Sequence, residues 1–322
     1  MLVGKAPFCD FQTIQSAIDF SEKQSNEAEW ITMTILEGIY EEQVTVSRSK
    51  LKIIGIGSVV ITHDASATQV DSNGQPLGTF RTATFYLDGS DLHLENLTIE
   101  NSAGQGEDVG QALAIYANCD KSTFKNCHFK GYQDTLFCAG LPETQKDGST
   151  FQQMRPQHAS YRQVYSKCTI EGTVDFIFGG ASAYFEQCII KSRKRKTNKD
   201  SYITAACTPE DQQIGFVFQS CYLIAEPGCN QVYLGRPWRP YAKVCFQACY
   251  LSDHIHPDRW DDWGKQKNRE TAQFLEYGTI QAEPILNKES WYTYKSALEE
   301  NLKLADVFEN PFYERVKEKG TE

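Results

Sequence analysis

The sequence predicts an all-β protein whose strands stack as a parallel β-helix. The main observation is a short repeat: an apolar residue, two variable residues, Cys or Leu, one variable residue and a second apolar residue. The copies recur at irregular intervals between residues 94 and 251. One fixed strand-like element with loops of variable length is typical of coils that contact only their neighbours. The central residues of the copies are Leu97, Cys127, Cys168, Cys188, Cys221 and Cys249.

The cysteines of this repeat are expected to be buried. Side chains alternate between the two faces of a strand, so Cys168 and Ile170 would point the same way. In-register stacking would bury a ladder of like residues, in which five of the 11 cysteines act as small hydrophobic side chains. The alternative, a set of disulfides or a metal site, stays open. The odd number of cysteines and the lack of a C-x-x-C pair argue against a zinc or redox motif.

The first predicted element is a helix within residues 10–24. Phe11, Ile14 and Ile18 recur at the spacing of one helical face, and such a helix could cap the open end of the stack. Residues 71–79 form a turn-rich loop further along the chain. The strand-like segments between these two elements are 31–36, 43–47, 51–55 and 58–62.

The rest of the chain adds a long loop and a helical end. Residues 138–163 combine glycine and proline with a polar stretch, and a loop of this length in a compact domain usually carries function or is disordered. The C-terminal segment 289–319 contains helical stretches, for example at 296–305. No linker divides the sequence, so we expect a single domain over 1–322.

Composition narrows the function classes. Lys+Arg 32 against Asp+Glu 42 gives a net charge of -10, which is a poor basis for non-specific nucleic-acid binding. No apolar run approaches the ~20 residues that a membrane span requires. This many thiols would risk mispairing in an oxidising compartment, so we expect a cytoplasmic protein, with secretion as the alternative if a leader has been removed. The basic run at 191–199 is interpreted as a solvated loop or as a contact to a polyanion.

Three short segments carry the candidate chemistry. G-Y-Q-D-T-L-F at 131–137 and G-T-V-D-F-I-F-G at 172–179 each place one aspartate among apolar and aromatic residues. A buried carboxylate is costly without a partner. Y-L-G-R-P-W at 233–238 supplies an arginine, whose guanidinium fork suits a carboxylate. From the residues alone, the two aspartates and this arginine could also be a structural ion network.

These three segments resemble the signature blocks of the pectin methylesterases (pectinesterases), which are carbohydrate esterases of the parallel β-helix type. The likeness extends from about residue 10 to about residue 264. Several spaced blocks in order form a far more specific signal than one short motif. The resemblance implies a right-handed, pectin-lyase-like β-helix. The further blocks are F-Q-T-I-Q-S-A-I near the start, G-I-Y-E-E-Q-V at 38–44, T-F-R-T-A-T-F at 79–85 and Q-A-L-A-I at 111–115.

By position, the resemblance implies a role for each matching residue. Asp175 matches the family nucleophile, Asp134 the general acid/base, and Arg236 the residue that orients the nucleophile. Gln111 and Gln133 match the donors that stabilise the oxyanion. The substrate-binding positions match Trp238, Phe80, Thr84, Phe137, Phe178 and Trp260, with Phe137 standing where many members have tyrosine.

The implied reaction is hydrolysis of the C6 methyl ester of galacturonate in pectin or oligogalacturonides, with release of methanol. An ionised aspartate attacks the ester carbonyl, amide donors meet the developing oxyanion, and a protonated aspartate gives methanol its proton. The resemblance implies no cofactor and no metal. We expect a monomer whose partner is the methyl-esterified substrate, without nucleic acid or membrane.

The long loop at 138–163 departs from the pattern of many plant members, in which the corresponding stretch is shorter. Similar extended loops occur in some bacterial members, so the chain resembles a bacterial-like member with an extended loop. Because the loop directly follows the acid/base block, we expect it to flank the cleft and to set which chain lengths fit.

Other function classes stay open. A glycoside hydrolase on a related β-helix would also use two carboxylates, although Gln111 and Gln133 suit an oxyanion, which glycosidic cleavage does not form. An acyl thioesterase would not need the sugar-platform aromatics Trp238 and Trp260. A non-catalytic polysaccharide-binding module would not need both aspartates together with the arginine.

Overall fold

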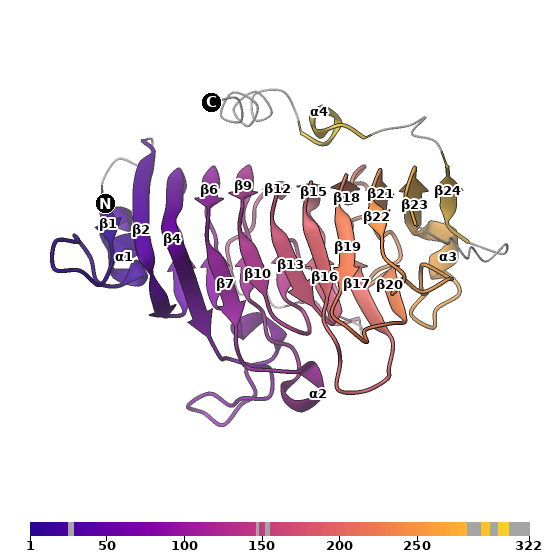
Figure 1. Cartoon of the computed structure of the whole chain (residues 1–322), viewed down its shortest axis with the longest axis horizontal. Helices are drawn as coiled ribbons and strands as arrows, with labels where there is room; N and C mark the ends of the chain where they lie inside the picture. The colour runs from indigo at the N-terminus through magenta and orange to yellow at the C-terminus, as the bar shows by residue number, and fades with distance from the viewer. Residues whose placement is uncertain (25–28, 146–147, 152–154, 282–290, 297–301, 309–322) are drawn as a thin grey trace.

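The chain folds into a right-handed parallel β-helix, as the sequence predicts (Figure 1). Successive coils stack along the long axis of the molecule, and the ladders between them are parallel. The expectation of a single domain over 1–322 stays a prediction. The computed structural model describes the chain apart from residues 25–28, 146–147, 152–154, 282–290, 297–301 and 309–322.

The strands form three faces. The first face contains β1 (Leu2–Val3), β2 (Ile31–Glu41), β4 (Leu51–His63), β6 (Leu92–Glu95), β9 (Ser122–Lys125), β12 (Arg162–Ser166), β15 (Ser182–Glu186), β18 (Phe216–Gln219), β21 (Lys243–Gln247), β23 (Gln273–Tyr277) and β24 (Thr293–Lys295). The second face contains β7 (Thr98–Asn101), β10 (His128–Lys130), β13 (Thr169–Gly172), β16 (Ile189–Ser192), β19 (Tyr222–Ala225) and β22 (Tyr250–Leu251). The third face contains β3 (Val44–Val46), β5 (Phe85–Leu87), β8 (Ile115–Ala117), β11 (Leu136–Cys138), β14 (Val174–Gly179), β17 (Ser201–Ala206) and β20 (Val232–Gly235).

The predicted strands at the start of the chain are confirmed. Segment 31–36 lies in β2, and segment 43–47 contains the shorter strand β3. Segments 51–55 and 58–62 are two parts of the one strand β4, which pairs with both β6 and β7 and so belongs to two faces. The loop predicted at 71–79 has no strand or helix until the 3-10 turn η1 (Thr79–Arg81).

Each copy of the repeat is a strand, a bend and a second strand. The bend is the residue directly before the central Leu or Cys, and it adopts the left-handed conformation with φ between 49° and 57°. That one residue turns the chain from the first face to the second without a longer loop. The bend residues are Asn96, Asn126, Lys167, Gln187, Ser220 and Ala248.

The cysteines of the repeat pack in the interior as predicted. All 11 cysteines are free thiols, and the five in the repeat are at most 1% exposed. Each of these five thiols contacts a carbonyl oxygen of the preceding coil, for example Cys168 Sγ with Phe124 O at 3.4 Å and Cys188 Sγ with Tyr165 O at 3.3 Å. Core packing therefore accounts for the repeat cysteines, and the disulfide alternative is wrong.

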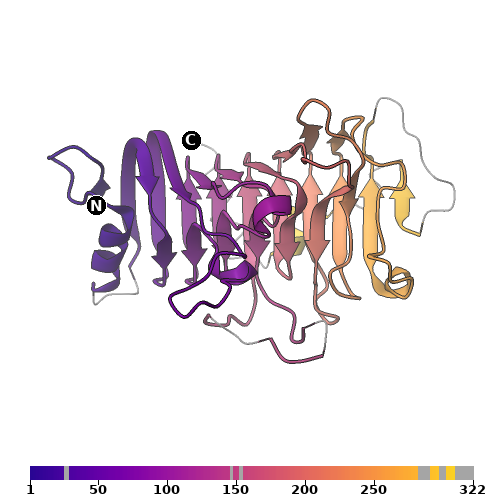
Figure 2. The same cartoon turned by 90° about the horizontal axis from the view of Figure 1, so that it is seen from below.

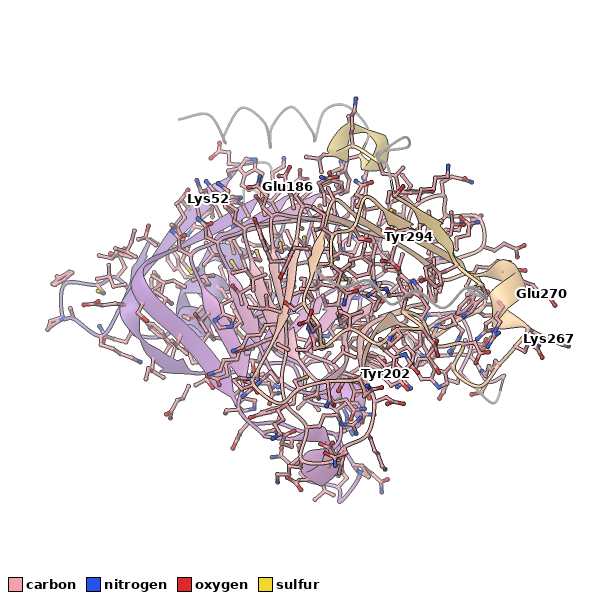
Figure 3. The ribbon with its side chains drawn as sticks, turned by 45° about the vertical axis from the view of Figure 1, so that its right-hand side comes forward. Lys52, Glu186, Tyr202, Lys267, Glu270 and Tyr294 are labelled. Carbon is pink, nitrogen blue, oxygen red and sulfur yellow. The ribbon has the colours of Figure 1, made fainter. Side chains whose placement is uncertain are left out.

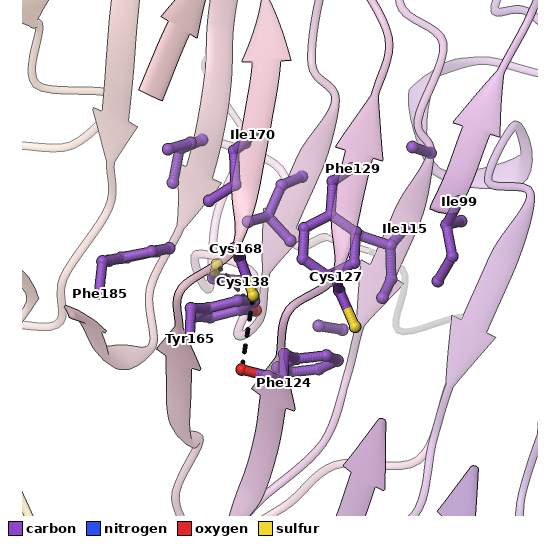
Figure 4. Close-up of a cluster of buried hydrophobic side chains, with 14 of the residues drawn as sticks. Ile99, Ile115, Phe124, Cys127, Phe129, Cys138, Tyr165, Cys168, Ile170 and Phe185 are labelled. Atoms are coloured by element: carbon purple, nitrogen blue, oxygen red, sulfur yellow. Dashed lines mark hydrogen bonds between the residues drawn. The ribbon is translucent and has the colours of Figure 1, made fainter. Parts of the chain in front are cut away.

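An aromatic stack runs beside these thiols and fixes the register of the coils. Phe124, Tyr165, Phe185, Phe218 and Phe246 are the first apolar residues of successive repeats, and neighbouring rings lie 4.3–4.6 Å apart and nearly parallel. Figure 4 shows the part of this interior that contains Phe124, Tyr165 and Phe185. A one-residue slip would move these rings out of the core, so the stack opposes it.

Helices cover the first coil and part of the first face. α1 (Ile14–Glu22) begins later than predicted, because Phe11 instead bridges Val3 and the Glu42 carboxylate accepts hydrogen bonds from the Ile14 and Gln15 backbone N–H groups. Its buried face packs beside β2 and β3, so the helix caps this end.

The helical prediction near the C-terminus is only partly testable. α3 (Asn268–Thr271) lies before this segment, and α4 (Leu304–Val307) lies beside the first face (Figure 1). Residues 293–295 form β24 because they extend the ladder of β23. Within 296–305, residues 302–303 are not helical and 297–301 lie outside the described residues. In the described part of the chain, no helix has the length and apolarity to span a membrane.

Phe185→Ala should destabilise the protein strongly. The ring is fully buried and lies between Tyr165 and Phe218, so the substitution leaves a cavity and should lower the free energy of unfolding by about 3–5 kcal/mol. Tyr222→Ala is the matched control, because Tyr222 is 56% exposed and its loss should change stability by about 0.5 kcal/mol or less. Urea unfolding of both variants checks this, and equal losses would contradict the role of the stack.

Candidate active site

The five residues proposed for catalysis line one cleft. A cleft of about 690 Å³ lies over the third face, and it is bounded by loops that precede its strands and loops that follow them. Seen from below, α2 (Gly106–Val109) and the neighbouring loops lie over the middle of the stack (Figure 2). The cleft is lined by Gln111, Gln133, Asp134, Asp175 and Arg236, together with Thr79, Phe80, Gln145, Phe151, Phe178, Ala205, Trp238, Arg239 and Trp263.

The two aspartates occupy adjacent coils. Asp134 precedes β11, and Asp175 is the second residue of β14, which pairs in register with β11. Both aspartates are left-handed, with φ of 63° and 50°, and the Asp134 backbone N–H donates to Val174 O at 3.0 Å. Left-handed non-glycine residues are uncommon and concentrate where the surrounding structure imposes them. The local backbone therefore presents both carboxyl groups toward the same cleft.

Arg236 binds Asp175 through two hydrogen bonds. The arginine follows β20, and its Nε and Nη2 donate to Asp175 Oδ1 and Oδ2 at 2.9 and 2.7 Å. The guanidinium lies between the rings of Tyr202 and Trp263, with its Cζ 3.8 Å from each ring centroid. Figure 3 shows Tyr202 on the opposite side of the molecule from Lys52 and Glu186 of the first face. This aromatic sandwich fixes the arginine, and the bidentate pair fixes the Asp175 carboxylate.

Asp134 has the opposite electrostatic environment. Burial raises the pKa of its carboxyl well above 3.8, the negative charge of Asp175 raises it further, and Arg236 lowers it only in part. Asp134 is 8% exposed and Asp175 7% exposed, so the two carboxyl groups are buried to a similar degree, and they differ in that only Asp175 binds the arginine. This environment favours the protonated form of Asp134 and the ionised form of Asp175.

The two glutamines stand beside these carboxyl groups. Gln133 directly precedes Asp134, and its backbone carbonyl accepts a hydrogen bond from Ala112 N–H at 3.2 Å, next to Gln111. Both side chains line the cleft and are half-buried. Amide N–H donors at this place can stabilise negative charge that develops on a substrate oxygen.

Three of the residues predicted to bind substrate line the cleft, and two others lie below its surface. Phe80, Phe178 and Trp238 line the cleft. Thr84 is fully buried and donates its hydroxyl to Glu100 O at 2.8 Å, so its prediction as a lining residue is wrong. Phe137 is also fully buried; it packs under Phe80 and Phe178, at 5.3 and 5.0 Å between ring centroids, and supports the cleft floor instead of lining it.

The prediction for Trp260 is wrong, and Trp263 was missed. Trp260 is 2% exposed and stacks on Phe274 at 4.2 Å in the interior. Trp263, three residues later, lines the cleft and covers Arg236. Arg259 and Trp263 both have left-handed φ, so the chain turns twice across this short stretch. The sequence W-D-D-W offered both tryptophans, but only this backbone path decides which one faces the cleft.

The long loop between β11 and β12 flanks the cleft, as predicted. Its residues Gln145 and Phe151 line the cleft, and the Phe151 ring lies 6.0 Å from Phe80 and 6.4 Å from Trp238. Further along the loop, the Arg155 guanidinium forms an ion pair with Asp88 and lies over the Tyr86 ring at 3.7 Å. These contacts hold the described parts of the loop against the third face.

The fold and site place the chain in a known family. The pectinesterase family model matches residues 1–308, so the chain belongs to the pectinesterase family. It is 34% identical over 260 residues to the putative pectinesterase/pectinesterase inhibitor 28 of Arabidopsis thaliana, covering 79% of this chain and 32% of that protein. It is 32% identical over 277 residues to pectinesterase 31 of the same plant, covering 83% and 78% of the two chains. The chain thus spans about a third of the first relative's length.

Solved structures agree with this assignment. Pectin methylesterase PemA from Erwinia chrysanthemi superimposes with a TM-score of 0.77 at 27% identity, over 96% of each chain. A pectin methylesterase in complex with a hexasaccharide gives the same values. The carrot pectin methylesterase has a TM-score of 0.77 at 25% identity, over 92% of this chain and 88% of that one. The β-helix of this chain is therefore shared with these solved structures.

Asp134→Asn should stabilise the protein at neutral pH. The folded protein keeps the Asp134 proton above pH 3.8, where the unfolded chain releases it, so stability falls as the pH rises from there toward the raised pKa. Asparagine has no proton to lose, so this loss of stability is absent from the variant. We expect Asp134→Asn to be more stable than wild type at pH 7, with the difference shrinking toward zero below pH ~4.

Urea unfolding at several pH values measures this effect. Asp175→Asn is the control, because it leaves a buried Arg236 without its partner and should lower stability at pH 7 by about 3–5 kcal/mol. A loss of stability in Asp134→Asn at neutral pH would contradict a protonated Asp134.

Proposed function

We propose that the protein is a carbohydrate esterase that hydrolyses the methyl esters of galacturonate in pectin or oligogalacturonides and releases methanol. The observation that carries the proposal is the pair of carboxyl groups in one cleft, with the Asp175 carboxylate bound by Arg236 and the pKa of Asp134 raised by burial. Membership in the pectinesterase family supports the substrate class. A hexasaccharide complex of a related pectin methylesterase supports a cleft that accepts an oligosaccharide.

In the first half of the proposed reaction, an Asp175 oxygen attacks the carbonyl carbon of the methyl ester. The Arg236 pair aims the carboxylate while leaving it ionised. Negative charge moves to the carbonyl oxygen, where the Gln111 and Gln133 amides donate hydrogen bonds, each typically worth about 3 kcal/mol. The C–O bond to the methoxy group then breaks as Asp134 gives it a proton, so methanol leaves and an acyl-enzyme anhydride remains.

In the second half, water replaces methanol. Asp134 is now ionised and takes a proton from the attacking water, whose oxygen bonds to the substrate acyl carbon. The bond to the Asp175 oxygen breaks, which frees the galacturonate carboxylate and restores both aspartates. Atoms and protons balance without a redox step, and no resident cofactor enters the cycle.

Two other activities predict different products. A β-helix glycoside hydrolase would create reducing ends, whereas the esterase releases methanol and leaves the chain length unchanged. An acyl thioesterase would not need the aromatic surface of Phe178, Trp238 and Trp263 that the cleft presents. Trp260 was predicted to line the cleft but lies in the interior. This does not weaken the argument, because Trp263 supplies a second indole at the cleft beside Trp238.

Methanol release from methylated pectin and from short methylated oligogalacturonides tests the proposed function. Wild-type protein should release methanol without added metal, and Asp175→Ala and Asp134→Ala should each lower the rate by about 10²–10⁴-fold or more. Thr84→Ser is the control, since Thr84 lies outside the cleft. Release of reducing ends without methanol would instead favour the glycoside hydrolase.

The long loop is proposed to select chain length. Phe151 stands against Phe80 and Trp238 across the cleft surface, so it narrows the space for a sugar chain. Phe151→Ala should raise kcat/KM for polymer relative to a short oligogalacturonide by about 10-fold, the effect of about 1.4 kcal/mol. Phe8→Ala, a change at an exposed phenylalanine outside the cleft, is the control. An unchanged ratio for Phe151→Ala would contradict this role.

We also propose that the protein folds in a reducing compartment. The free thiols of successive coils, such as Cys168, Cys188 and Cys221, come from one repeated position and would all be exposed together in the unfolded chain. Folding under oxidising conditions would allow them to mispair. This supports the cytoplasm as the site of folding, and imported oligogalacturonides would then be the substrate.

A further inference from the structure

The basic run between β16 and β17 forms hydrogen bonds and ion pairs with segments that carry residues of the catalytic cleft. The sequence suggested a solvated loop or a polyanion contact, but the structure pairs several of its side chains with acidic and polar groups of the protein. We define the basic brace as residues 193–197. Its side chains reach two segments, the turn 131–134 and the segment 105–111, and these carry Gln133 and Gln111.

Arg193 holds the turn that contains Gln133. Its Nη1 donates to Gly131 O at 3.0 Å, its Nη2 donates to the Tyr132 hydroxyl at 2.7 Å, and its Cζ lies 3.7 Å from the centre of the Tyr132 ring. Its Nε lies 3.5 Å from Glu226 Oε1, so the guanidinium is fixed from the other side as well. The two residues that directly precede Gln133 are therefore bound to one half-buried guanidinium.

The next residues of the basic brace hold α2. Arg195 Nε and Thr197 Oγ1 both donate to Glu107 Oε1, at 2.6 and 3.1 Å, and Lys196 forms an ion pair with Asp108. The backbone carbonyl of Lys194 also accepts a hydrogen bond, at 3.1 Å, from a side chain just before α2. α2 is thus anchored through both of its acidic residues.

Anchoring α2 matters because its first residue touches Gln133. A Cβ added to Gly106 would lie 2.7 Å from Gln133 Cβ and 2.6 Å from Gln133 Oε1, so no side chain fits between them. α2 also ends at Gly110, directly before Gln111. A shift of α2 would therefore move Gln111 directly and would push against Gln133.

We propose that the basic brace is a positioning device that fixes Gln133 and Gln111 as oxyanion donors, with Arg193 as its central residue. This inference rests on the proposed function, because it assigns the two glutamines to the ester oxyanion. Asp134 is anchored separately through Val174, so the effect of Arg193 should pass mainly through Gln133. Misplacing a donor by about 1 Å can cost about 10²-fold in rate.

Kinetics of methanol release test the proposal. Arg193→Met should lower kcat by about 10- to 100-fold while KM changes by about 3-fold or less. Gly106→Ala, which leaves every ion pair in place, should lower kcat in the same way. Arg193→Lys keeps the charge but not the forked donation, and it should restore only part of kcat. Lys199→Met removes an equal charge from an exposed position of the same run and should leave kcat unchanged.

A double-mutant cycle separates positioning from general destabilisation. With Gln133→Ala already present, Arg193→Met should cost about 3-fold or less, because the donor it positions is gone. The full 10- to 100-fold loss in that background would overturn the proposal. The proposal would also be overturned if Arg193→Met lost kcat and thermal stability together while Gly106→Ala lost neither.

Hydrogen–deuterium exchange provides a measurement independent of activity. Arg193→Met should speed backbone exchange in peptides that cover 105–111 and 131–134, and Lys199→Met should not. Unchanged exchange in these peptides would overturn the brace even if the wild-type enzyme is active. An inactive wild type with the expected exchange pattern would refute the esterase assignment and leave the mechanical coupling established.

Discussion

In-register stacking of parallel coils is the constraint on which the rest of the structure depends. Adjacent strands lie about 4.8 Å apart, and β11, β14, β17 and β20 pair one after another across the third face. Residues that enter this face at comparable positions in successive coils therefore become neighbours. Arg236 and Asp175 are 61 residues apart in sequence but share two hydrogen bonds. The stacked rings and thiols of the interior hold this register.

The chemistry of the cleft depends on the one positive charge of Arg236, which binds Asp175 and not Asp134. Asp134 and Asp175 are buried to a similar degree, and each would be expensive to ionise alone. Arg236 binds Asp175 and only partly offsets the effects that raise the pKa of Asp134. Tyr202 and Trp263 keep the guanidinium on its partner. A nucleophile and an acid can then coexist in one cleft at one pH.

The sequence predicted the architecture and the polar core of the site better than its aromatic walls. The Cys-containing repeat predicted the fold because each copy has the same strand–bend–strand geometry, and one fixed bend leaves little freedom. Asp175 and Arg236 were predictable as a pair because a buried carboxylate needs a specific partner. Asp134 and the roles of all three residues came from the resemblance to the family blocks. Trp260 and Thr84 were misplaced because aromatic and hydroxyl side chains also suit the interior, and local backbone turns decide which side they face. The pairing of Arg195 with Glu107 joins a loop to α2, two segments that no local sequence pattern connects.

Infrared difference spectroscopy at neutral pH tests the central claim, which is that Asp134 is protonated while Asp175 is ionised. The spectrum of wild type minus Asp134→Asn should contain a protonated carboxyl C=O band. The same band should persist in Asp175→Asn, because burial is the main reason that the Asp134 pKa is raised. Absence of the band from wild type, or its loss in Asp175→Asn with retention in Asp134→Asn, would contradict the account.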